Sequence, residues 1–540
     1  MPSITRHIRN YFALFSLLIA LFSFSSCSGI FGGDEAGSSD GSQKGTVTLN
    51  LGGGTLSRIT WPPLEDGGLA GSPSRSDLEF EVFFSGVRIN ATPITGFLGY
   101  YSFFVPYGNH DIEVRTFVKP NTPTNSTNYR SHYGTGRIPG INVPGQGSTP
   151  VTVTMQQAGT LANPFLIYNE FQLRRVGRGA LNPSGFDHWT FGSHYRLAAN
   201  ITITGGDWVP IPGFSGTFNG GGFSISGLTF DTPSFSSPGM FELNIGTIEN
   251  LNLLGVNFEF TAFIPGTFHF GGVAGTNQGI VRNITVQGSL EFLGFAISWL
   301  GGVVGRNELG GIIENSSFTG SVQSSTSTIS CAVGGVVGYN GGTVTRSRSS
   351  GSVLGENMVG GIVGVNGGLV QNSHSSSDVS GAIQVGGVVG ANQGTVQNNY
   401  SSGYVSGSLS GILDESIGGV VGESFFGGTV QNNAALNQSI TRLSGVNPLF
   451  GRVSAFATGV IFNNHARADM VFIDGGITQP DFPIPVVSDP NGMHGADVSP
   501  GTLPGQFNNQ SFWETTLGWD FTNVWQMQGS PPLPVLRPPP

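Results

Sequence analysis

The sequence predicts an all-β protein, in which a right-handed parallel β-helix follows a small antiparallel β-sandwich. The first observation is the pentapeptide Gly-Gly-aliphatic-aliphatic-Gly, which occurs six times, beginning at Gly271, Gly301, Gly334, Gly360, Gly386 and Gly418. The second is the spacing of these copies, 26 to 33 residues, which indicates a solenoid whose repeats bury their apolar faces by stacking. The third is the composition, with 86 glycines in 540 residues and only 10% charged residues. Average proteins contain about 7% glycine, so the excess favours a chain rich in turns.

Each repeat is consistent with three short strands and three turns. In the copy GGIVGVNGGLVQNSHSSSDVSG, from Gly360 to Gly381, aliphatic segments alternate with Gly, Asn and Ser, which favour tight turns. The repeat is shorter than a propeller blade of about 40–45 residues and lacks the leucine spacing and helix of a leucine-rich repeat. A parallel β-helix remains, and its crossovers should be right-handed.

Aliphatic residues recur in register and predict ladders that fill a dry interior. They are Val344, Val370, Val396 and Val430 in the second strand, and Val353, Val379 and Val405 in the third. In the first strand, the adjacent Val336 and Val337 should point to opposite faces. We therefore expect one of these two ladders to face outward beneath loops or a neighbouring coil, and the alternative is an exposed apolar stripe that serves as a contact surface.

Asparagine and cysteine positions suggest further interior features. Asn340, Asn366 and Asn392 occupy equivalent positions, and we expect an internal stack that satisfies backbone groups at a turn. The alternative is a polar binding ladder. Cys331 directly precedes a pentapeptide and should be a small apolar filler of the core.

The segments that flank the repeats predict a sandwich and two caps. Strand-like runs at 46–51, 78–84, 100–105, 111–118 and 151–155 predict the sandwich. Asn169 is a candidate N-cap for a short helix over Glu170–Val176, which would close the first coil. Trp513, Trp519 and Trp525 should form the core of a cap at the other end, and a sugar-stacking platform is the alternative.

The N-terminal residues predict export. Arg6 and Arg9 precede an apolar run from Tyr11 to Phe24 that is typical of a secretory signal peptide. Phe24-Ser25-Ser26-Cys27 resembles a lipobox, which implies lipid attachment at Cys27. The alternative is an ordinary signal with an incidental cysteine. The Gly/Ser-rich stretch that follows should be a flexible tether, with an acidic calcium loop as the alternative.

Charge and motif content argue against several functions. The net charge is −10 and Lys44 and Lys119 are the only lysines, so we expect no nucleic-acid partner. No metalloprotease His-Glu-x-x-His motif and no phosphate-binding loop occur, and we expect no cofactor and no metal.

Acidic residues of the repeats do not recur at one position, so no pair about 5–9 Å apart is expected to act as general acid and base. These residues are Glu308, Glu314, Glu356, Asp378, Asp414, Glu415 and Glu423. Asp187 and His188 lie near His194, and Asp207 adjoins Trp208, but we expect solvated or capping roles for them. We therefore expect no enzyme, and the alternative is a carbohydrate-active β-helix enzyme, a polysaccharide lyase or hydrolase.

The repeats resemble the GLUG motif, which occurs in arrays in bacterial cell-surface proteins, including the noncatalytic part of some immunoglobulin A peptidases. Residues 159–228 and 512–536 resemble the opening and closing segments of such arrays. The chain departs from the pattern at Asn219, at Glu423-Ser424 and at the terminal prolines 538–540. The resemblance implies surface display and binding, and it identifies neither a ligand nor a ligand face.

The expected organisation is a lipoprotein signal peptide (1–26), a tether (27–45), a β-sandwich (46–157), a GLUG-type β-helix with an N-terminal cap (158–500) and a C-terminal capping segment (501–540). We expect a bacterial envelope protein that is anchored by lipid in the outer membrane. It would be exposed at the cell surface, and the alternative is that it faces the periplasm. Its role would be adhesin-like or scaffolding, with a host or envelope glycan or protein bound along the side of the β-helix. A purely architectural spacer is the remaining possibility.

Overall fold

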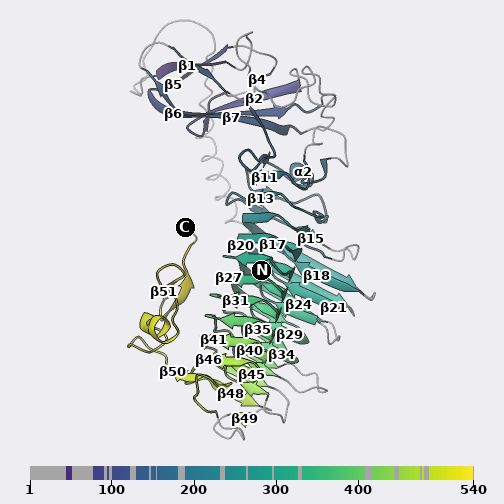
Figure 1. Cartoon of the computed structure of the whole chain (residues 1–540). Helices are drawn as coiled ribbons and strands as arrows, with labels where there is room; N and C mark the ends of the chain where they lie inside the picture. Colours follow the sequence, from purple (N-terminus) through teal and green to yellow (C-terminus); the bar gives the residue numbers. More distant parts are fainter. Residues whose placement is uncertain are drawn as a thin grey trace, which may run out of the picture.

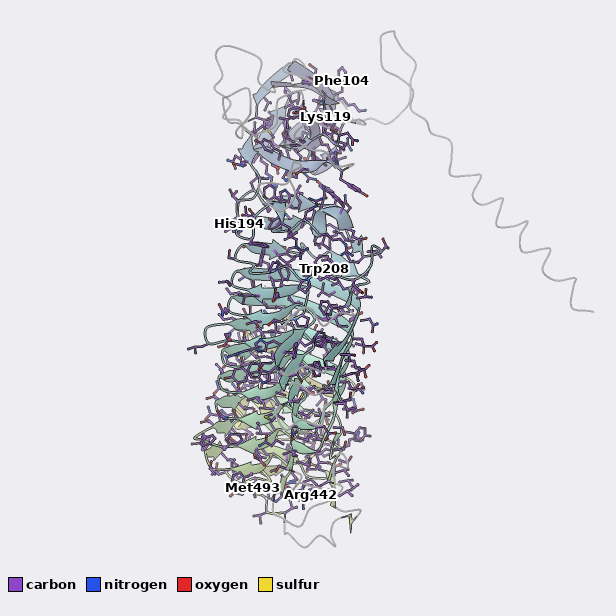
Figure 2. All side chains as sticks on the ribbon, turned by 90° about the vertical axis from the view of Figure 1, so that its right-hand side faces the viewer. Phe104, Lys119, His194, Trp208, Arg442 and Met493 are labelled. Carbon is purple, nitrogen blue, oxygen red and sulfur yellow. The ribbon has the colours of Figure 1, made fainter. Side chains whose placement is uncertain are left out.

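The structure, a computed structural model, describes residues 44–50, 77–90, 94–95, 100–121, 129–144, 148–153, 155–179, 189–230, 237–262, 266–294, 297–325, 331–407, 416–442, 449–474, 477–478 and 486–538. The predicted signal peptide, Cys27, most of the predicted tether, Asp187, His188, Asp414 and Glu415 lie outside these residues. Figure 1 shows a sandwich at one end, a rod of stacked coils, and a C-terminal segment beside the rod. Figure 2 shows the same order after a quarter turn, with Phe104 in the sandwich and Arg442 near the far end of the rod.

The N-terminal sandwich consists of two sheets that share one core. One sheet contains β5 (Tyr100–Pro106), β1 (Lys44–Asn50) and β8 (Ser148–Thr152). The other contains β3 (Val87–Arg88), β2 (Leu78–Phe84), β6 (Gly108–Val118), β7 (Ser131–Val143) and β9 (Gln156–Gln157), with β4 (Ile94–Thr95) paired to β2. Val47, Leu49, Val82, Val114 and Val151 from both sheets meet in the core. The pairs are antiparallel as expected, except that β1 and β8 run parallel.

The rod is a parallel β-solenoid, which confirms the predicted fold class. Its first sheet contains β16 (Phe241–Asn244), β19 (Ala274–Asn277), β22 (Val304–Asn307), β26 (Val337–Asn340), β30 (Val363–Asn366), β35 (Val389–Asn392), β40 (Val421–Ser424) and β45 (Ser454–Ala457). Its second contains β18 (Thr267–Gly271), β21 (Ile297–Gly301), β25 (Cys331–Gly334), β29 (Asn357–Gly360), β34 (Ile383–Gly386), β39 (Ile417–Gly418) and β44 (Phe450–Gly451).

The third sheet turns a corner and covers the remaining sides of the rod. Its first strands are β10 (Phe165–Ile167), β11 (His194–Leu197), β12 (Ile201–Thr202), β13 (Thr217–Asn219), β14 (Ser224–Ser226), β15 (Thr229–Phe230), β17 (Thr247–Ala262), β20 (Ile280–Gly294), β23 (Ile312–Glu314) and β24 (Ser317–Ser324). Its middle strands are β27 (Thr343–Thr345), β28 (Arg348–Leu354), β31 (Leu369–Gln371), β32 (His374–Ser375), β33 (Asp378–Gly381), β36 (Thr395–Gln397), β37 (Tyr400–Ser401) and β38 (Val405–Gly407). Its last strands are β41 (Thr429–Gln431), β42 (Ala434–Ala435), β43 (Ser439–Arg442), β46 (Val460–Phe462), β47 (His465–Arg467), β48 (Val471–Asp474), β49 (Ile477–Thr478) and β50 (Ala496–Val498).

The valine ladders fill the interior as predicted. Val344, Val370, Val396 and Val430 pair in register and are fully buried. The alternative of an exposed apolar stripe in the first strand is wrong, because Val336 and Val337 are both 0% exposed. The outward ladder is also absent here, because both residues belong to the core cluster of the rod. Val336 lies in the bend between β25 and β26, so the strand alternation is interrupted there and both side chains enter the core.

The last glycine of the pentapeptide is required by a close approach of main chain. A Cβ on Gly364 would lie 2.7 Å from the carbonyl oxygen of Gly338 and 2.7 Å from the amide nitrogen of Val333. A Cβ this close to main-chain atoms would force the backbone to shift, so glycine is strongly favoured at this point of β30, directly after the bend between the first two sheets.

The N-terminal end of the rod carries the predicted short helix. Helix α2 spans Glu170–Leu173, and the Asn169 side chain accepts a hydrogen bond from the Gln172 amide over 3.0 Å. The helix is shorter than expected, because the chain continues as turns after Leu173. Leu173 and Val176 are nevertheless fully buried in the core of the rod.

The C-terminal segment packs against the side of the rod, whereas we expected it to close the end (Figure 1). It contains a short π-helix, η4 (Phe512–Thr516), and a hairpin of β51 (Trp525–Gly529) and β52 (Pro532–Leu536). Its core joins Tyr400, Ala434 and Leu436 of the rod. The outward side chains of β37 and β42 form an apolar strip with Leu436, and the C-terminal segment removes this strip from water.

Candidate functional site

One side of the rod presents a regular surface, which we call the lateral face. It is formed by the outward side chains of β11, β13, β23, β27, β31, β36, β41, β46 and the starts of β17 and β20. In each of these strands the central residue points inward, and the residues before and after it point outward. The first outward row is His194, Thr217, Thr247, Ile280, Ile312, Thr343, Leu369, Thr395, Thr429 and Val460. The second is Arg196, Asn219, Glu249, Arg282, Glu314, Thr345, Gln371, Gln397, Gln431 and Phe462.

The chemistry of the lateral face changes along the rod. Near the sandwich it is charged, because Glu249 accepts hydrogen bonds from Asn219 over 2.6 Å and from Arg282 over 2.6 Å. Further along it becomes an amide ladder, in which Gln431 donates to Gln397 over 2.7 Å and Gln397 donates to Gln371 over 2.9 Å. Neighbouring coils lie about 4.8 Å apart, so the face offers polar groups at a fixed repeat.

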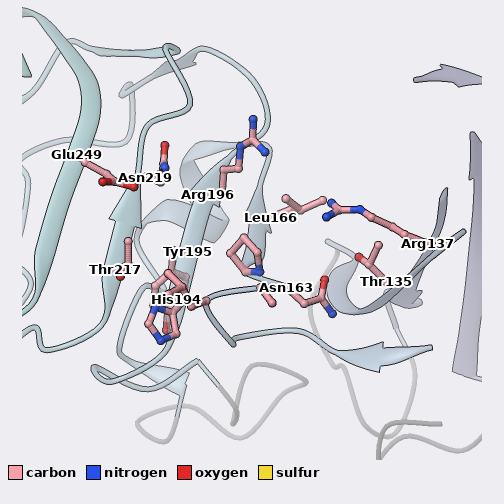
Figure 3. A pocket seen from close by; sticks show the side chains of 13 residues that line it. Thr135, Arg137, Asn163, Leu166, His194, Tyr195, Arg196, Thr217, Asn219 and Glu249 are labelled. Carbon is pink, nitrogen blue, oxygen red and sulfur yellow. Dashed lines mark hydrogen bonds between the residues drawn. The ribbon is translucent and has the colours of Figure 1, made fainter. Parts of the chain in front are cut away.

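A pocket lies where the lateral face meets the sandwich (Figure 3). It has a volume of about 180 Å³. Its walls are Thr135, Arg137, Leu161, Ala162, Asn163, Pro164 and Leu166 on one side, and His194, Tyr195, Arg196, Thr217, Asn219 and Glu249 on the other. Burial lowers the pKa of His194, and its Nδ1 atom has no hydrogen-bond partner among the described residues. The pocket therefore offers guanidinium, imidazole and amide groups to a polar ligand.

The pocket lacks the paired carboxylates of a glycoside hydrolase within the described residues. Glu249 is the one carboxylate among the described residues that line it. His194 lies two strands and two residues away in the register, which corresponds to about 10 Å across the sheet and about 7 Å along it. These two side chains therefore do not form an acid–base pair.

Other acidic residues singled out from the sequence serve local roles. Glu308 pairs with Arg306, and Glu423 accepts hydrogen bonds from Ser416 and Gln384. Near the first coils, Asp207 accepts a hydrogen bond from the Thr229 hydroxyl over 3.1 Å, and the buried Trp208 donates its indole N–H to the Met240 carbonyl over 2.8 Å.

Asparagines form an internal ladder, as we preferred, and the alternative of a binding ladder is wrong. Each side-chain Nδ2 donates to the Oδ1 of the next asparagine over 2.7–2.9 Å, and all of these side chains are fully buried. The ladder runs through Asn244, Asn277, Asn307, Asn340, Asn366 and Asn392. A second ladder, Asn399–Asn433–Asn464, was not predicted, although the recurring Asn-Asn pairs that contain it are visible in the sequence.

Aromatic groups that suggest sugar platforms are already covered. Trp513, Trp519 and Trp525 are at most 3% exposed, so they form a core as expected. Trp299 is half-buried, but His269 stacks on it at 4.7 Å between ring centroids and Tyr339 at 5.0 Å. Neither set presents a free ring face of an indole to a ligand.

Cys331 is fully buried between the Ser298 and Ser324 hydroxyls, which agrees with its predicted role as a core filler. Among the described residues, no three or more His, Cys, Asp or Glu side chains are grouped to hold a metal ion. Within the same residues, no helix has the length and apolar character needed to cross a membrane.

Comparisons with known proteins support the repeat assignment. The model of the GLUG motif matches residues 300–323. Halomucin of Haloquadratum walsbyi is 28% identical over an alignment of 188 residues, and the match covers 32% of this chain and 2% of halomucin. The chain thus spans a very small part of the length of that relative. A crystal structure of a proposed immunoglobulin A1 protease from Bacteroides ovatus is similar with a TM-score of 0.37 and 15% identity, over 71% of this chain and 95% of that chain.

Proposed function

We propose that this protein is a lipid-anchored cell-envelope protein with an adhesin-like or scaffolding role, which binds glycan or protein ligands along the side of its β-solenoid. The observation that carries the proposal is the lateral face, where the hydroxyl groups of Thr395 and Thr429 and the amide ladder Gln371–Gln397–Gln431 repeat from coil to coil beside aliphatic side chains such as Leu369. A glycan fits this surface best, because its hydroxyl groups can exchange hydrogen bonds with threonine and glutamine side chains at a matching repeat.

Each coil would make only a few weak contacts with a ligand on this face, but the contacts along several coils together would give a high affinity. A single hydrogen bond contributes about 0.5–1.5 kcal/mol net. Several contacts along one ligand act together, because each contact raises the effective concentration for the next. A rigid rod also loses little conformational freedom when it binds, which favours a modest contact over a large area.

The proposed role is nonenzymatic. Support comes from Glu249, which is held by Asn219 and Arg282 and has no second carboxylate beside it in the described pocket. A polysaccharide lyase or hydrolase is the competing function. Incubation of the full chain with a panel of soluble glycans separates the two, because released reducing ends or unsaturated sugars would contradict the nonenzymatic role.

The lateral face can be tested by a single obstructing substitution. Gln397→Arg places a long charged side chain in the middle of the amide ladder, and we expect it to reduce binding to an immobilised glycan array at least tenfold. Gln323→Arg is the matched control, because Gln323 also points outward from the rod but lies on another side, in β24. Equal binding by the two variants would contradict binding on the lateral face.

Anchoring and location need their own experiment. Metabolic labelling with an alkyne fatty acid should mark the wild-type protein, and Cys27→Ser should abolish the label. Protease treatment of intact cells should then remove the rod if the lipoprotein is exposed at the outer surface. Retention of the label in the Cys27→Ser variant, or full protection from protease, would overturn the corresponding part of the proposal.

A further inference from the structure

A second pocket lies where the C-terminal segment ends on the rod. The outward residues of one row of the third sheet are Thr285, Ser317, Arg348, His374, Tyr400, Ala434 and His465. The C-terminal segment covers the later part of this row, where the Tyr400 hydroxyl donates to the Pro534 carbonyl over 2.8 Å. Its last described residues stop short of the earlier part. Thr285, Ser317 and Arg348 therefore form the floor of a pocket of about 270 Å³, and Leu536, Arg537 and Pro538 form a wall.

Three guanidinium groups line this pocket, and two of them are fixed by uncharged acceptors. Arg346 donates to the carbonyl oxygens of Asn523 over 3.1 Å and Arg537 over 3.3 Å. Arg537 donates to the carbonyl oxygens of Trp525 and Phe521, each over 2.9 Å. Because carbonyl oxygens carry no formal charge, these bonds orient both side chains without neutralising them.

The third guanidinium group has no partner among the described residues. Arg348 is exposed, and its side chain forms neither a hydrogen bond nor an ion pair within the described part of the chain. No described carboxylate lines the pocket. Two described acids lie near the pocket without lining it. The pKa of Asp520 is lowered by hydrogen bonds from Asn523 and Thr522 and, more weakly, by Arg346. Glu314 directly precedes Asn315 and belongs to the lateral face. A chain with net charge −10 thus gathers three positive charges around one small cavity.

The remaining lining suits a sugar. The Ser317 hydroxyl can donate to the Thr285 hydroxyl over 3.4 Å or to the Ile284 carbonyl over 3.5 Å, and in both cases the hydroxyl hydrogen of Thr285 is left for a ligand. Leu536 and Pro538 add apolar surface on the opposite side. A sugar ring presents both kinds of surface, hydroxyl groups at its edge and C–H groups on its faces. A carboxylate or sulfate on that ring would accept paired hydrogen bonds from a guanidinium group.

The pocket also lies next to the lateral face. Asn315 and Arg346, which line it, directly follow Glu314 and Thr345, the last outward residues of β23 and β27. A chain molecule that lies along the lateral face at Thr345 can therefore reach the pocket by passing one corner of the rod.

We propose that this pocket binds an acidic sugar residue of a glycan, through a carboxylate or sulfate held by Arg346, Arg348 and Arg537. The inference rests on the proposed function and names the ligand class. Arg348 supplies the charge that has no other partner, the two fixed arginines complete the anion site, and Thr285 and Leu536 contact the sugar ring.

The test is calorimetric titration of the full chain with a glucuronate-containing disaccharide, its sulfated counterpart and a neutral disaccharide. We expect one of the two acidic ligands to bind and the neutral one to bind at least tenfold more weakly. Arg348→Gln should weaken acidic binding at least tenfold, and Arg348→Lys should weaken it less, because charge remains while the paired geometry is lost. Arg88→Gln is the matched control, since Arg88 is an exposed arginine of β3 in the sandwich that lines neither pocket and lies outside the lateral face, and it should change the affinity less than twofold.

Further outcomes would overturn the inference. Acidic binding that is unchanged in Arg348→Gln would exclude this pocket, and equally tight binding of inorganic phosphate or of a peptide carboxylate would exclude sugar recognition. Binding of neutral glycans that Gln397→Arg blocks, without acidic binding, would refute the acidic-sugar site alone. Absence of binding to every glycan would refute both this inference and the glycan part of the proposed function.

Discussion

The early and late coils of the rod fill the same cross-section in two different ways. At the central position of the lateral-face strands, the early coils place Tyr195 and Phe218, whereas the late coils place Val370 and Val396. The rings of the early coils interlock, as where Phe165 stacks on Trp189 at 5.0 Å between centroids. The late coils rely on identical side chains in register. Large rings can therefore fill coils that differ in shape from one to the next. Small repeated side chains stack in register only where every coil has the same shape.

The comparison predicts that deleting one core side chain costs more in the early coils. Phe218→Ala should lower the free energy of unfolding by about 4 kcal/mol, because it removes a fully buried ring and leaves a large cavity. Val370→Ala, at the equivalent position, should cost about 2 kcal/mol, since only two methyl groups are lost. Urea unfolding monitored by circular dichroism measures both. Equal losses in the free energy of unfolding for the two variants would show that the early and late coils tolerate the removal of a core side chain equally well.

The next largest effect should come from the asparagine ladder, which both halves share. Asn366 donates to Asn392 over 2.9 Å and accepts from Asn340 over 2.8 Å, entirely out of contact with water. Asn366→Ala leaves buried donors and acceptors without partners, so we expect a loss of about 3 kcal/mol.

A matched control for the ladder lies at a nearby corner. Asn372 has φ of 50°, a left-handed conformation that glycine adopts readily. Asn372→Gly should therefore change the free energy of unfolding by no more than about 0.5 kcal/mol. A loss in Asn366→Ala as small as in this control would contradict a ladder that holds the coils together.

A smaller effect is expected at the glycine bends that the late coils require. Gly364→Ala forces a Cβ against main-chain atoms and should cost about 2 kcal/mol. Gly367→Ala should be nearly neutral, because the nearest atom to its Cβ would be the Tyr339 hydroxyl oxygen at 3.4 Å. Hydrogen exchange of the flanking backbone amides would show whether the loss of protection is confined to the neighbouring coils.

The smallest predicted effect concerns acid. Burial, and next the charge of Arg348, lower the pKa of His374 to about 3. An unfolded histidine titrates near pH 6.5, so below that pH the unfolded state binds a proton that the folded state does not. Stability should therefore fall as the pH drops from about 6.5 toward about 3, by about 1 kcal/mol for this residue between pH 6.5 and 5.5.

His374→Phe tests this prediction, since a phenyl ring can keep the stacking on Tyr400, whose ring lies 5.0 Å away. The free energies of unfolding of the wild type and the variant should differ by a constant amount above pH 7. Below pH 6.5 the free energy of the wild type should fall more steeply with decreasing pH than that of the variant. His132 and His269, whose pKa values are lowered to about 3 and about 4, keep their own share of the pH dependence in both proteins. If the free energy of unfolding of His374→Phe depended on pH as steeply as that of the wild type, His374 would not be the origin of the loss of stability in acid.

Much of the rod was predictable because its determinants are local and repeated. The valine ladders and the asparagine stack follow directly from equal spacing in the sequence. The placement of Val336 was predicted wrongly, because strand alternation was assumed to continue through a glycine bend that interrupts it. The bend depends on how closely two main-chain segments approach, which a residue pattern does not report.

The candidate sites were less predictable, because they join residues far apart in the chain. The lateral face could have been anticipated from the outward positions of the short strands, but its pocket needs the sandwich residues Thr135 and Arg137. The arginine pocket arises because Arg346 meets Arg537, 191 residues later. Its existence depends on the C-terminal segment packing on the side of the rod, and no local pattern distinguishes that position from the end.

The C-terminal segment also has a mechanical consequence. It is tied to Arg346 at one end through Asn523, and to Asn432 and Asn463 further along through Trp519 and Thr516. These corners are separated by four coil steps, about 20 Å along the axis. Each coil of a solenoid contacts only its neighbours, so a solenoid under tension unfolds from its last coil, one coil at a time. Because the C-terminal segment is fastened at both ends, it shares the load among the coils it spans. We therefore expect these coils to resist stepwise unfolding under force better than a bare stack of equal length.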